Sequence, residues 1–217
     1  MRDTSTGLGS LGKAGKAADW MEFLSAFETE FFKGRSGPFR DYLGKYSGRL
    51  LILGDGRTVW EDEAKYDKKT HFDTMGVKMA GAVYPRLTHW AHLHPEQWAI
   101  WEHLRKIRGG RIKGATPPTK IVHGSKTESL KDGAIVFPCQ YGGNSGMFAA
   151  LVGIALGYDE ITLAGCPSDG SGHYYDPPRV KNEYSNFEGH EKNWRFCKEN
   201  FFFGKVKSLS GNTKEWL

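Results

Sequence analysis

The chain has few cysteines and no segment long and apolar enough to sit in a bilayer. Its 217 residues include 3 cysteines, Cys139, Cys166 and Cys197, which are far apart and form no C-x-x-C pair. That number and spacing favour neither a disulfide framework nor a zinc knuckle. No run approaches the ~20 apolar residues that span a bilayer, and the N-terminus carries no apolar signal segment. We therefore expect a cytoplasmic protein with no membrane span.

Two common nucleotide-binding loops are also missing. The sequence contains no G-x-x-x-x-G-K-[ST] loop, which argues against a P-loop enzyme. The G-x-G-x-x-G fingerprint is incomplete, because Gly54 and Gly56 supply its first two glycines while Val59 stands in the third place. A nicotinamide-dependent dehydrogenase is therefore not expected. No Asp-x-Asp pair follows a predicted strand, so we expect no metal cofactor to be required.

What the sequence does contain favours one packed domain that binds an anion. Hydrophobic residues make up 39% of the chain and aromatic residues 13%, which supports a buried core at this length. The formal net charge of +5 suits a nucleotide or a nucleic acid. The basic cluster at 105–113 lacks the interleaved aromatic residues of a single-strand platform. A nucleotide-type small molecule is thus the expected partner, and nucleic acid stays an alternative.

The pattern along the chain predicts three segments. Residues 1–18 are rich in Gly, Ser, Lys and Ala and are expected to be a disordered tail. Residues 19–48 are expected to hold an amphipathic helix and a linker, and residues 49–217 a single Rossmann-like nucleotide-binding catalytic domain. In that domain a helix is predicted at 95–108. After a first strand from 49, further strands are predicted near 71–77, 88–93, 120–123, 134–137 and 160–163.

Strands that alternate with helices predict an α/β fold. We expect a Rossmann-like, three-layer α/β/α arrangement with a mainly parallel sheet and right-handed crossovers. A long insertion near 166–189 has no clear helix or strand pattern, and a loop of that length inside a domain is usually functional.

The clearest unit of the sequence lies at 144–165. Asn144 or Ser145 is expected to cap a helix, and Gly157 is expected to end it. A short buried strand follows at 161–163. With the strand before it, this unit predicts a β–α–β crossover that points backbone N–H groups at a ligand above the sheet, usually a phosphate.

Candidate ligand-binding residues follow several strands, because ligands of open α/β sheets bind outside the carboxyl ends of the strands. Gly56 lets the backbone approach a ligand closely, and Asp55 can accept a hydrogen bond from a hydroxyl or an amine. His89, His92 and His94 invite a metal interpretation. On a strand, however, His92 and His94 share a face while His89 points away, so three converging zinc ligands are not expected.

Three segments resemble a known family. They are Ser145-Gly146 with the helix end Ile154-Ala155-Leu156-Gly157-Tyr158 and the strand Glu160 to Gly165, the first strand with Gly54-Asp55-Gly56-Arg57-Thr58, and Gly189-His190-Glu191-Lys192-Asn193. They resemble the small, metal-independent, Rossmann-like bacterial sialyltransferases. They are equally similar to archaeal and viral proteins related to 6-hydroxymethylpterin pyrophosphokinase. The resemblance covers roughly 49–210 and suggests a viral or phage-type member, which would work in the host cytoplasm.

The resemblance implies roles for individual residues. The nucleotide and its sugar would be bound by Gly54, Asp55, Gly56, Arg57, Thr58, His94, Ser145 and Gly146. The insertion would act as a lid-like segment in which Tyr174 and Tyr175 hold the leaving phosphate. His190 would be the general base that deprotonates the acceptor, with His173 as the second candidate, since imidazole titrates nearest neutral pH.

The chain departs from the family pattern at several of these places. Asp55 stands where the family has Asn, Arg57-Thr58 where it has Pro-Ser, and Pro167 where it has Asp. A second family asparagine, expected near Gly76, is absent.

We therefore predict a nucleotide-dependent transferase, a glycosyltransferase that takes a sugar from a nucleotide-sugar donor without metal. One alternative is diphosphate transfer from ATP, which needs Mg²⁺ near carboxylates such as Asp55 and Asp169. The other is a non-catalytic protein that binds nucleotide or nucleic acid on the same fold. The sequence leaves the donor sugar, the acceptor and the oligomeric state open.

Overall fold

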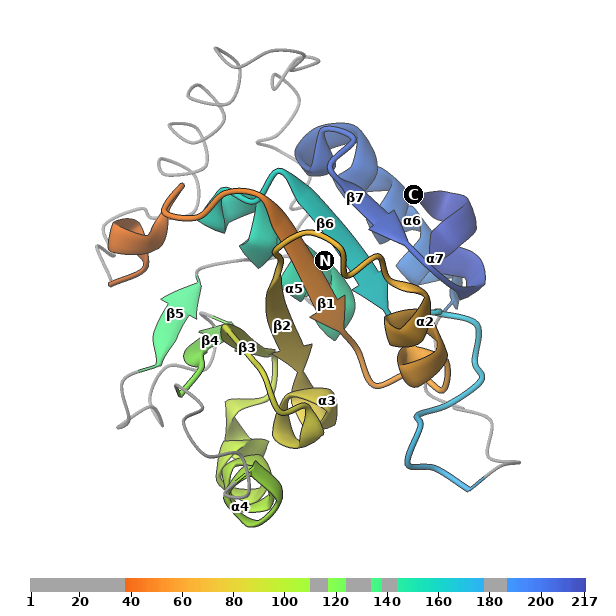
Figure 1. Cartoon of the computed structure of the whole chain (residues 1–217). Helices are drawn as coiled ribbons and strands as arrows, with labels where there is room; N and C mark the ends of the chain where they lie inside the picture. The colour runs from red at the N-terminus through yellow and green to blue at the C-terminus, as the bar shows by residue number, and fades with distance from the viewer. Residues whose placement is uncertain (1–37, 110–116, 124–133, 138–143, 178–186) are drawn as a thin grey trace, which may run out of the picture.

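One parallel sheet of seven strands organises the protein (Figure 1). The computed structural model describes residues 38–109, 117–123, 134–137, 144–177 and 187–217. The strands, in chain order, are β1 (Arg49–Leu53), β2 (Asp73–Val77), β3 (His89–His92), β4 (Thr119–His123), β5 (Ile135–Phe137), β6 (Glu160–Ala164) and β7 (Val206–Ser208). The helices are η1 (Pro38–Tyr42), α2 (Val59–Lys65), α3 (Lys78–Val83), η2 (Pro95–Gln97), α4 (Trp98–Gly109), α5 (Ser145–Leu156), α6 (Phe187–Cys197), η4 (Lys198–Phe202) and α7 (Gly211–Trp216).

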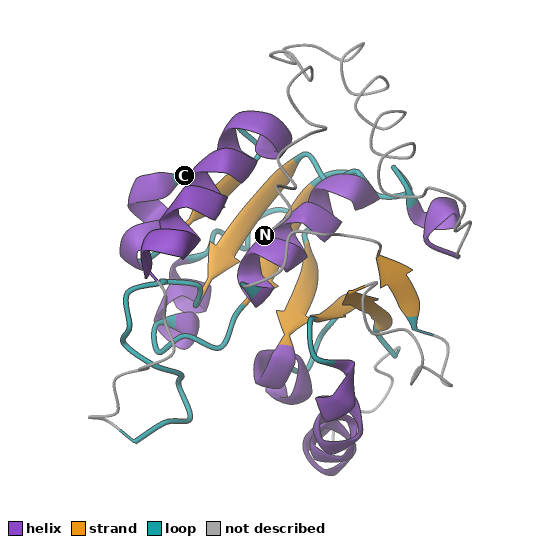
Figure 2. Cartoon of the chain, turned by 180° about the vertical axis from the view of Figure 1, so that it is seen from behind, coloured by secondary structure: helices purple, strands orange, loops and turns teal. Residues whose placement is uncertain are grey.

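Helices cover both faces of the sheet. One face packs against α5, α6 and the C-terminal helices in the largest core cluster, which includes Leu50, Ile52 and Phe148. The other face, with Leu51 and Leu53, packs against α2 and α3, and α4 extends that layer. In Figure 2, which shows the molecule from the side opposite to Figure 1, α5 lies in front of the strands. The predicted α/β, Rossmann-like, three-layer fold is therefore confirmed.

The six predicted strands are all present, and each pairs in parallel with its neighbour. Strands β1 and β6 read as nearly continuous apolar runs because helices bury both of their faces. The seventh strand, β7, was not predicted. It has three residues and an exposed Lys207 at its centre, so its sequence carries too little periodicity to be recognised.

Helix α5 begins and ends where the sequence indicates. Asn144 is the residue that caps it: its Oδ1 accepts hydrogen bonds from the Gly146 and Met147 amides, at 2.9 and 3.2 Å. Gly157 ends it in the left-handed conformation, at φ 103°. Between these ends the helix is buried almost all round, since it passes between the sheet and the C-terminal helices.

The strand order reverses beside β1, and this reversal locates the site. The sheet order is β5-β4-β3-β2-β1-β6-β7, so β2 to β5 extend from one side of β1. Helix α5 then carries the chain back to β6 on the other side. Helix α2, after β1, lies on one face of the sheet, and α6, after β6, lies on the other. Open α/β sheets bind their ligands at such a switch point, outside the carboxyl ends of the strands.

Residues just before β1 also join the core. Phe39 of η1 is fully buried, with its ring 4.6 Å from that of Phe137. The predicted tail at 1–18 and the predicted helix at 19–32 lie outside the described residues. Among the described residues, no helix is long and apolar enough to cross a membrane. Cys166 and Cys197 are both buried.

Candidate functional site

The loop after β1 is closed against the loop after β6. A side chain at Gly54 would place its Cβ 2.4 Å from the Gly165 carbonyl oxygen, and one at Gly56 would meet Pro167 Cδ at 2.4 Å. The Gly56 amide donates to the Gly165 oxygen at 2.8 Å. Both glycines are therefore required by the packing of these two loops, and the Gly56 amide already has an acceptor inside the fold.

Asp55 caps the helix that follows β2. Its carboxylate accepts hydrogen bonds from the Ala80 amide at 2.7 Å and the Met79 amide at 3.3 Å. The local N-cap, Val77, has no side-chain acceptor to offer, so Asp55 takes that role from a different strand. Burial raises the pKa of Asp55 from 3.8 to about 6, although these amides and the Lys78 charge oppose the shift.

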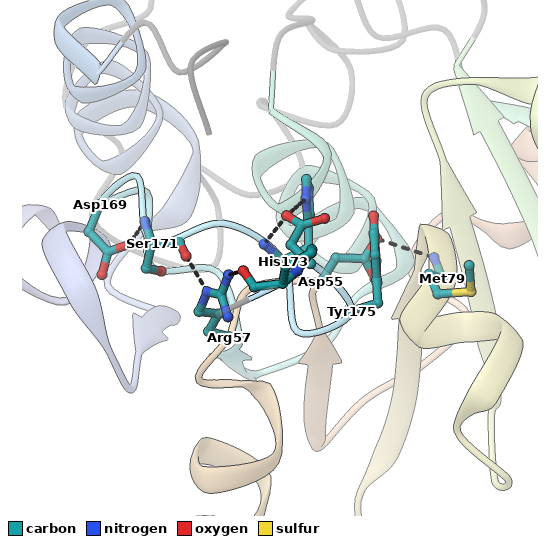
Figure 3. Close-up of polar contacts among 9 residues, drawn as sticks. Asp55, Arg57, Met79, Asp169, Ser171, His173 and Tyr175 are labelled. Carbon is teal, nitrogen blue, oxygen red and sulfur yellow. Dashed lines mark hydrogen bonds and ion pairs between the residues drawn. The ribbon is translucent and has the colours of Figure 1, made fainter. Parts of the chain in front are cut away.

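The Arg57 side chain binds the segment that follows β6. Its Nε donates to the Ser171 carbonyl, and its Nη2 donates to the Pro177 carbonyl at 2.5 Å. Four side chains lie where the loop after β1 meets the segment after β6. Figure 3 shows them side by side: Arg57, His173, Asp55 and Tyr175.

Thr58 belongs to a buried hydrogen-bond network at the start of α2. Its Oγ1 donates to Asp62 Oδ2 at 2.9 Å and lies 2.7 Å from Ser210 Oγ. The same Asp62 oxygen accepts from the Gly165 amide at 2.9 Å. Asp62 thus joins α2 to the loop after β6, and Thr58 joins the start of α2 to Ser210 after β7.

The segment that follows β6 lies directly on the β1 loop. His173 forms an antiparallel bridge with Gly56, and the Tyr174 amide donates to the Asp55 carbonyl oxygen at 2.9 Å. Residues 166–177 of the predicted lid-like insertion have no other strand or helix, and 178–186 lie outside the described residues.

His173 has the arrangement of a general base. Its Nδ1 lies 2.9 Å from Asp176 Oδ2, which also accepts from the His173 amide at 2.8 Å. A carboxylate in this position fixes the ring and its tautomer, and leaves Nε2 as the nitrogen that can take a proton. The ring is stacked on Tyr175, at 4° between planes and 5.0 Å between centroids.

The two tyrosines beside it present phenol groups at the same junction. The Tyr174 hydroxyl is buried and has no hydrogen-bond partner among the described residues, and its ring packs edge-on against Trp60. The Tyr175 hydroxyl lies 3.5 Å from Asp55 Oδ2. Burial, followed by the charge of Asp55, raises the pKa of both phenols. Both can therefore act as neutral hydrogen-bond donors at neutral pH.

The N-terminus of α5 lies against the loop after β6. A Cβ at Gly146 would approach Cys166 Sγ to 2.8 Å, so glycine is required there for packing. The Gly146 and Met147 amides donate to Asn144. Among the described residues the Ser145 amide has no acceptor, which leaves it for a ligand.

The other predicted residues lie further along the same edge. His94 follows β3, with its Nδ1 3.1 Å from Glu96 Oε1. His190 lies near the start of α6. Because α6 and η4 lead from the end of β6 to the start of the parallel β7, α6 begins at the carboxyl edge of the sheet. The structure therefore brings His190 to the same edge as His173.

The three histidines of the β3 region do not converge. His89 Nε2 lies 2.8 Å from the Tyr158 hydroxyl at the opposite, amino edge of the sheet. The ring of His92 is stacked on Trp101, at 3.8 Å between centroids. Within the described ranges, no group of three His, Cys, Asp or Glu side chains could hold a metal ion.

Arg105, from the basic cluster, also has a structural role. Its Nη1 donates to the carbonyl oxygens of Gly81 and Tyr84, both at 2.8 Å, and so fastens α4 to α3. Residues 110–116 lie outside the described residues.

Lys78 is a residue of this edge that the sequence did not indicate. It follows β2 directly, as the first residue of α3, and its φ of 46° is left-handed. A Gly or Asn there would have suggested a left-handed turn, whereas a lysine gives no such signal.

The comparisons with known proteins concern the fold. No protein-family profile matches the chain. No curated protein matches it either. A solved structure of the sialyltransferase CST-II in complex with a trisaccharide acceptor and CMP has a TM-score of 0.50 and 17% identity, over 76% of this chain and 82% of that one. Another, of CstII from Campylobacter jejuni with the substrate analogue cytidine-5'-monophosphate, has 0.49 and 15%, over 76% and 81%. The fold is therefore sialyltransferase-like.

Proposed function

We propose that this chain is a glycosyltransferase that moves a sugar from a nucleotide-sugar donor to a hydroxyl acceptor and requires no metal. The observation that carries the proposal is the imidazole of His173, which Asp176 orients. The backbone of His173 pairs with that of Gly56 beside the switch point of the sheet. A base held over the place where α/β sheets bind nucleotides is the arrangement that hydroxyl activation needs. The sialyltransferase CST-II, whose fold is similar, is described with CMP and a saccharide acceptor.

In the proposed reaction the acceptor oxygen forms a bond to the anomeric carbon of the donor sugar. The bond from that carbon to the phosphate oxygen breaks, and the nucleotide leaves with the electron pair. His173 Nε2 takes the proton of the acceptor hydroxyl. The phenols of Tyr174 and Tyr175 and the amide of Ser145 donate hydrogen bonds to the departing phosphate, where negative charge develops.

The residues contribute differently from what the resemblance implies. Arg57 positions the loop that carries His173, since its guanidinium binds two carbonyls of that loop. Asp55 positions α3, since its carboxylate accepts two amides of that helix. His190 remains a second candidate for the base, and the experiment below separates the two histidines.

Diphosphate transfer from ATP has no observation in its favour. Its Mg²⁺ would need Asp55 and Asp169, but the Asp55 carboxylate is occupied by backbone amides. Asp169 Oδ1 accepts from the Ser171 amide within its own loop.

The test is a transfer assay over CMP-, UDP- and GDP-linked sugars with a set of saccharide acceptors, run with EDTA and with Mg²⁺. We expect release of nucleotide in EDTA. His173→Ala should lower turnover about 10²- to 10⁴-fold, the usual contribution of a general base, and leave the Kd for the nucleotide unchanged. His103→Ala, on α4, is the matched control.

Two results would contradict parts of the proposal. Loss of activity in His190→Ala but not in His173→Ala would move the base to α6. Full activity in both variants would refute a histidine base, whereas no transfer from any nucleotide sugar, or no nucleotide binding by the wild-type chain, would refute the transferase.

A further inference from the structure

Lys78 brings a positive charge to the carboxyl edge of the sheet. It is the first residue after β2, which pairs directly with β1, and it is partly buried. Its backbone is fixed from two sides: the Trp90 Nε1 donates to its carbonyl oxygen at 3.0 Å, and Asp55 binds the next two amides, of Met79 and Ala80. The direction in which its side chain leaves the sheet is therefore set by three neighbouring strands.

The Lys78 side chain leaves the backbone at the carboxyl edge of β2, which lies between β1 and β3 in the sheet. Burial raises the pKa of Asp55 and of Cys166 and lowers that of His92, and the charge of Lys78 contributes in the lowering direction to all three. The Lys78 ammonium is thus an electrostatic neighbour of groups that follow β1 and β6 and end β3. Among the described residues it makes no hydrogen bond and no ion pair, because the Asp55 carboxylate is occupied by amides.

The backbone at Lys78 indicates that the side chain has a use. A φ of 46° is disfavoured for a lysine, whereas Gly or Asn adopts it at lower cost. Strained positions of this kind cluster at functional sites. Among the described residues no hydrogen bond or ion pair uses the lysine ammonium, and its charge is the property that distinguishes it from Gly or Asn.

A second source of positive potential lies beside Cys166, after β6, whereas Lys78 follows β2 on the other side of β1. The N-terminus of α5 touches Cys166 Sγ at Gly146, and the free Ser145 amide is next to it. An anion above Gly54 and Cys166 would therefore have a helix N-terminus on one side and an ammonium on the other. Arg57 cannot supply this charge, since its guanidinium holds the loop after β6.

We propose that Lys78 binds the phosphate of the nucleotide donor and stabilises it as the leaving group. The inference rests on the proposed function and deepens it, because it names the group that neutralises the departing charge. It also offers a reason for one departure from the family pattern, the absence of an asparagine near Gly76. A lysine binds phosphate as a point charge and needs no fixed fork geometry.

The test compares phosphorylated and unphosphorylated ligands on the full chain. By calorimetry we would measure 5′-monophosphates of cytidine, uridine, adenosine and guanosine, the matching nucleosides, and inorganic pyrophosphate. Lys78→Asn removes the charge in a residue type that tolerates the left-handed backbone, and Lys78→Arg restores a cation. Lys65→Ala, at the exposed end of α2, is the matched control.

We expect Lys78→Asn to weaken the best-bound monophosphate roughly 10- to 100-fold, the usual effect of one charge-assisted hydrogen bond. Binding of the nucleoside should stay as in the wild type and the melting temperature should not fall, since Asn adopts the left-handed backbone at lower cost. Lys78→Arg should recover part of the affinity, and Lys65→Ala should have no effect. Equal affinity of wild type and Lys78→Asn for the monophosphate, or an equal loss for the nucleoside, would overturn the assignment of Lys78 and leave the proposed transferase standing. Lys78-dependent binding of phosphate compounds without transfer from any nucleotide sugar would support Lys78 and refute the transferase. No binding of any phosphate compound would overturn both.

Discussion

Replacing Asp55 with asparagine should change how the stability of the fold depends on pH. Burial raises the pKa of Asp55 to about 6 in the folded protein, from 3.8. Between these two values the folded chain binds more protons than the unfolded chain. The contribution of Asp55 to stability is therefore fully present below pH 3.8 and is lost as the pH rises through about 6. The whole displacement corresponds to about 3 kcal/mol, at ~1.4 kcal/mol per pKa unit.

The asparagine side chain of the Asp55→Asn variant is not titratable, and its amide has the shape of the protonated carboxyl group. It keeps one oxygen for the Ala80 amide, which lies 2.7 Å from the Asp55 carboxylate. Asp55→Asn should thus match the wild type in acid and become more stable than it, by up to about 3 kcal/mol, at neutral pH. Urea unfolding of both proteins over roughly pH 4 to 8 measures the difference. Asp169→Asn, at an exposed carboxylate of the same region, is the control and should follow the wild type. A constant difference between Asp55→Asn and the wild type across this range would refute the reasoning.

Two further predictions concern the loops around the site. Gly146→Ala should destabilise the fold by about 1–3 kcal/mol, because the new Cβ would lie 2.8 Å from Cys166 Sγ; urea unfolding should show partial recovery in Gly146→Ala/Cys166→Ala, and no recovery would contradict the packing explanation. Arg57→Ala should raise amide hydrogen exchange in the loop about 10-fold with little change in melting temperature, since it frees the carbonyls of Ser171 and Pro177; unchanged exchange would mean that other contacts hold the loop.

The sequence predicted the fold well where local signals and tertiary packing agree. Strands β1 and β6 are apolar because both faces are buried, and the ends of α5 carry a cap at Asn144 and a left-handed glycine at Gly157. Strand β7 lacked both kinds of signal. It is placed by pairing with β6 and by the packing of the C-terminal helices, which only the folded chain reveals.

The sequence indicated where the candidate site residues lie in the fold but not which groups their side chains contact. The predicted residues after β1, and His173, do meet at the switch point. Their contacts could not be inferred from the sequence. Arg57 binds carbonyls more than a hundred residues away along the chain, and Asp55 caps α3, the helix that follows the next strand. Lys78 went unnoticed because the signal for its position is a backbone angle, not a residue type.

Asp55 contacts two parts of the candidate site, one through its side chain and the other through its main chain. Its side chain holds the amides of the helix that begins with Lys78, and its main-chain carbonyl accepts from the Tyr174 amide, next to His173. The backbone positions that carry the ammonium and the imidazole are thereby both tied to Asp55. In a displacement reaction the leaving group and the attacking hydroxyl must lie on opposite sides of one carbon, so a fixed spacing between their two partners is a form of preorganisation. A change at Asp55 would then disturb ground-state binding and proton removal together, although Asp55 itself contacts neither reacting atom in this scheme.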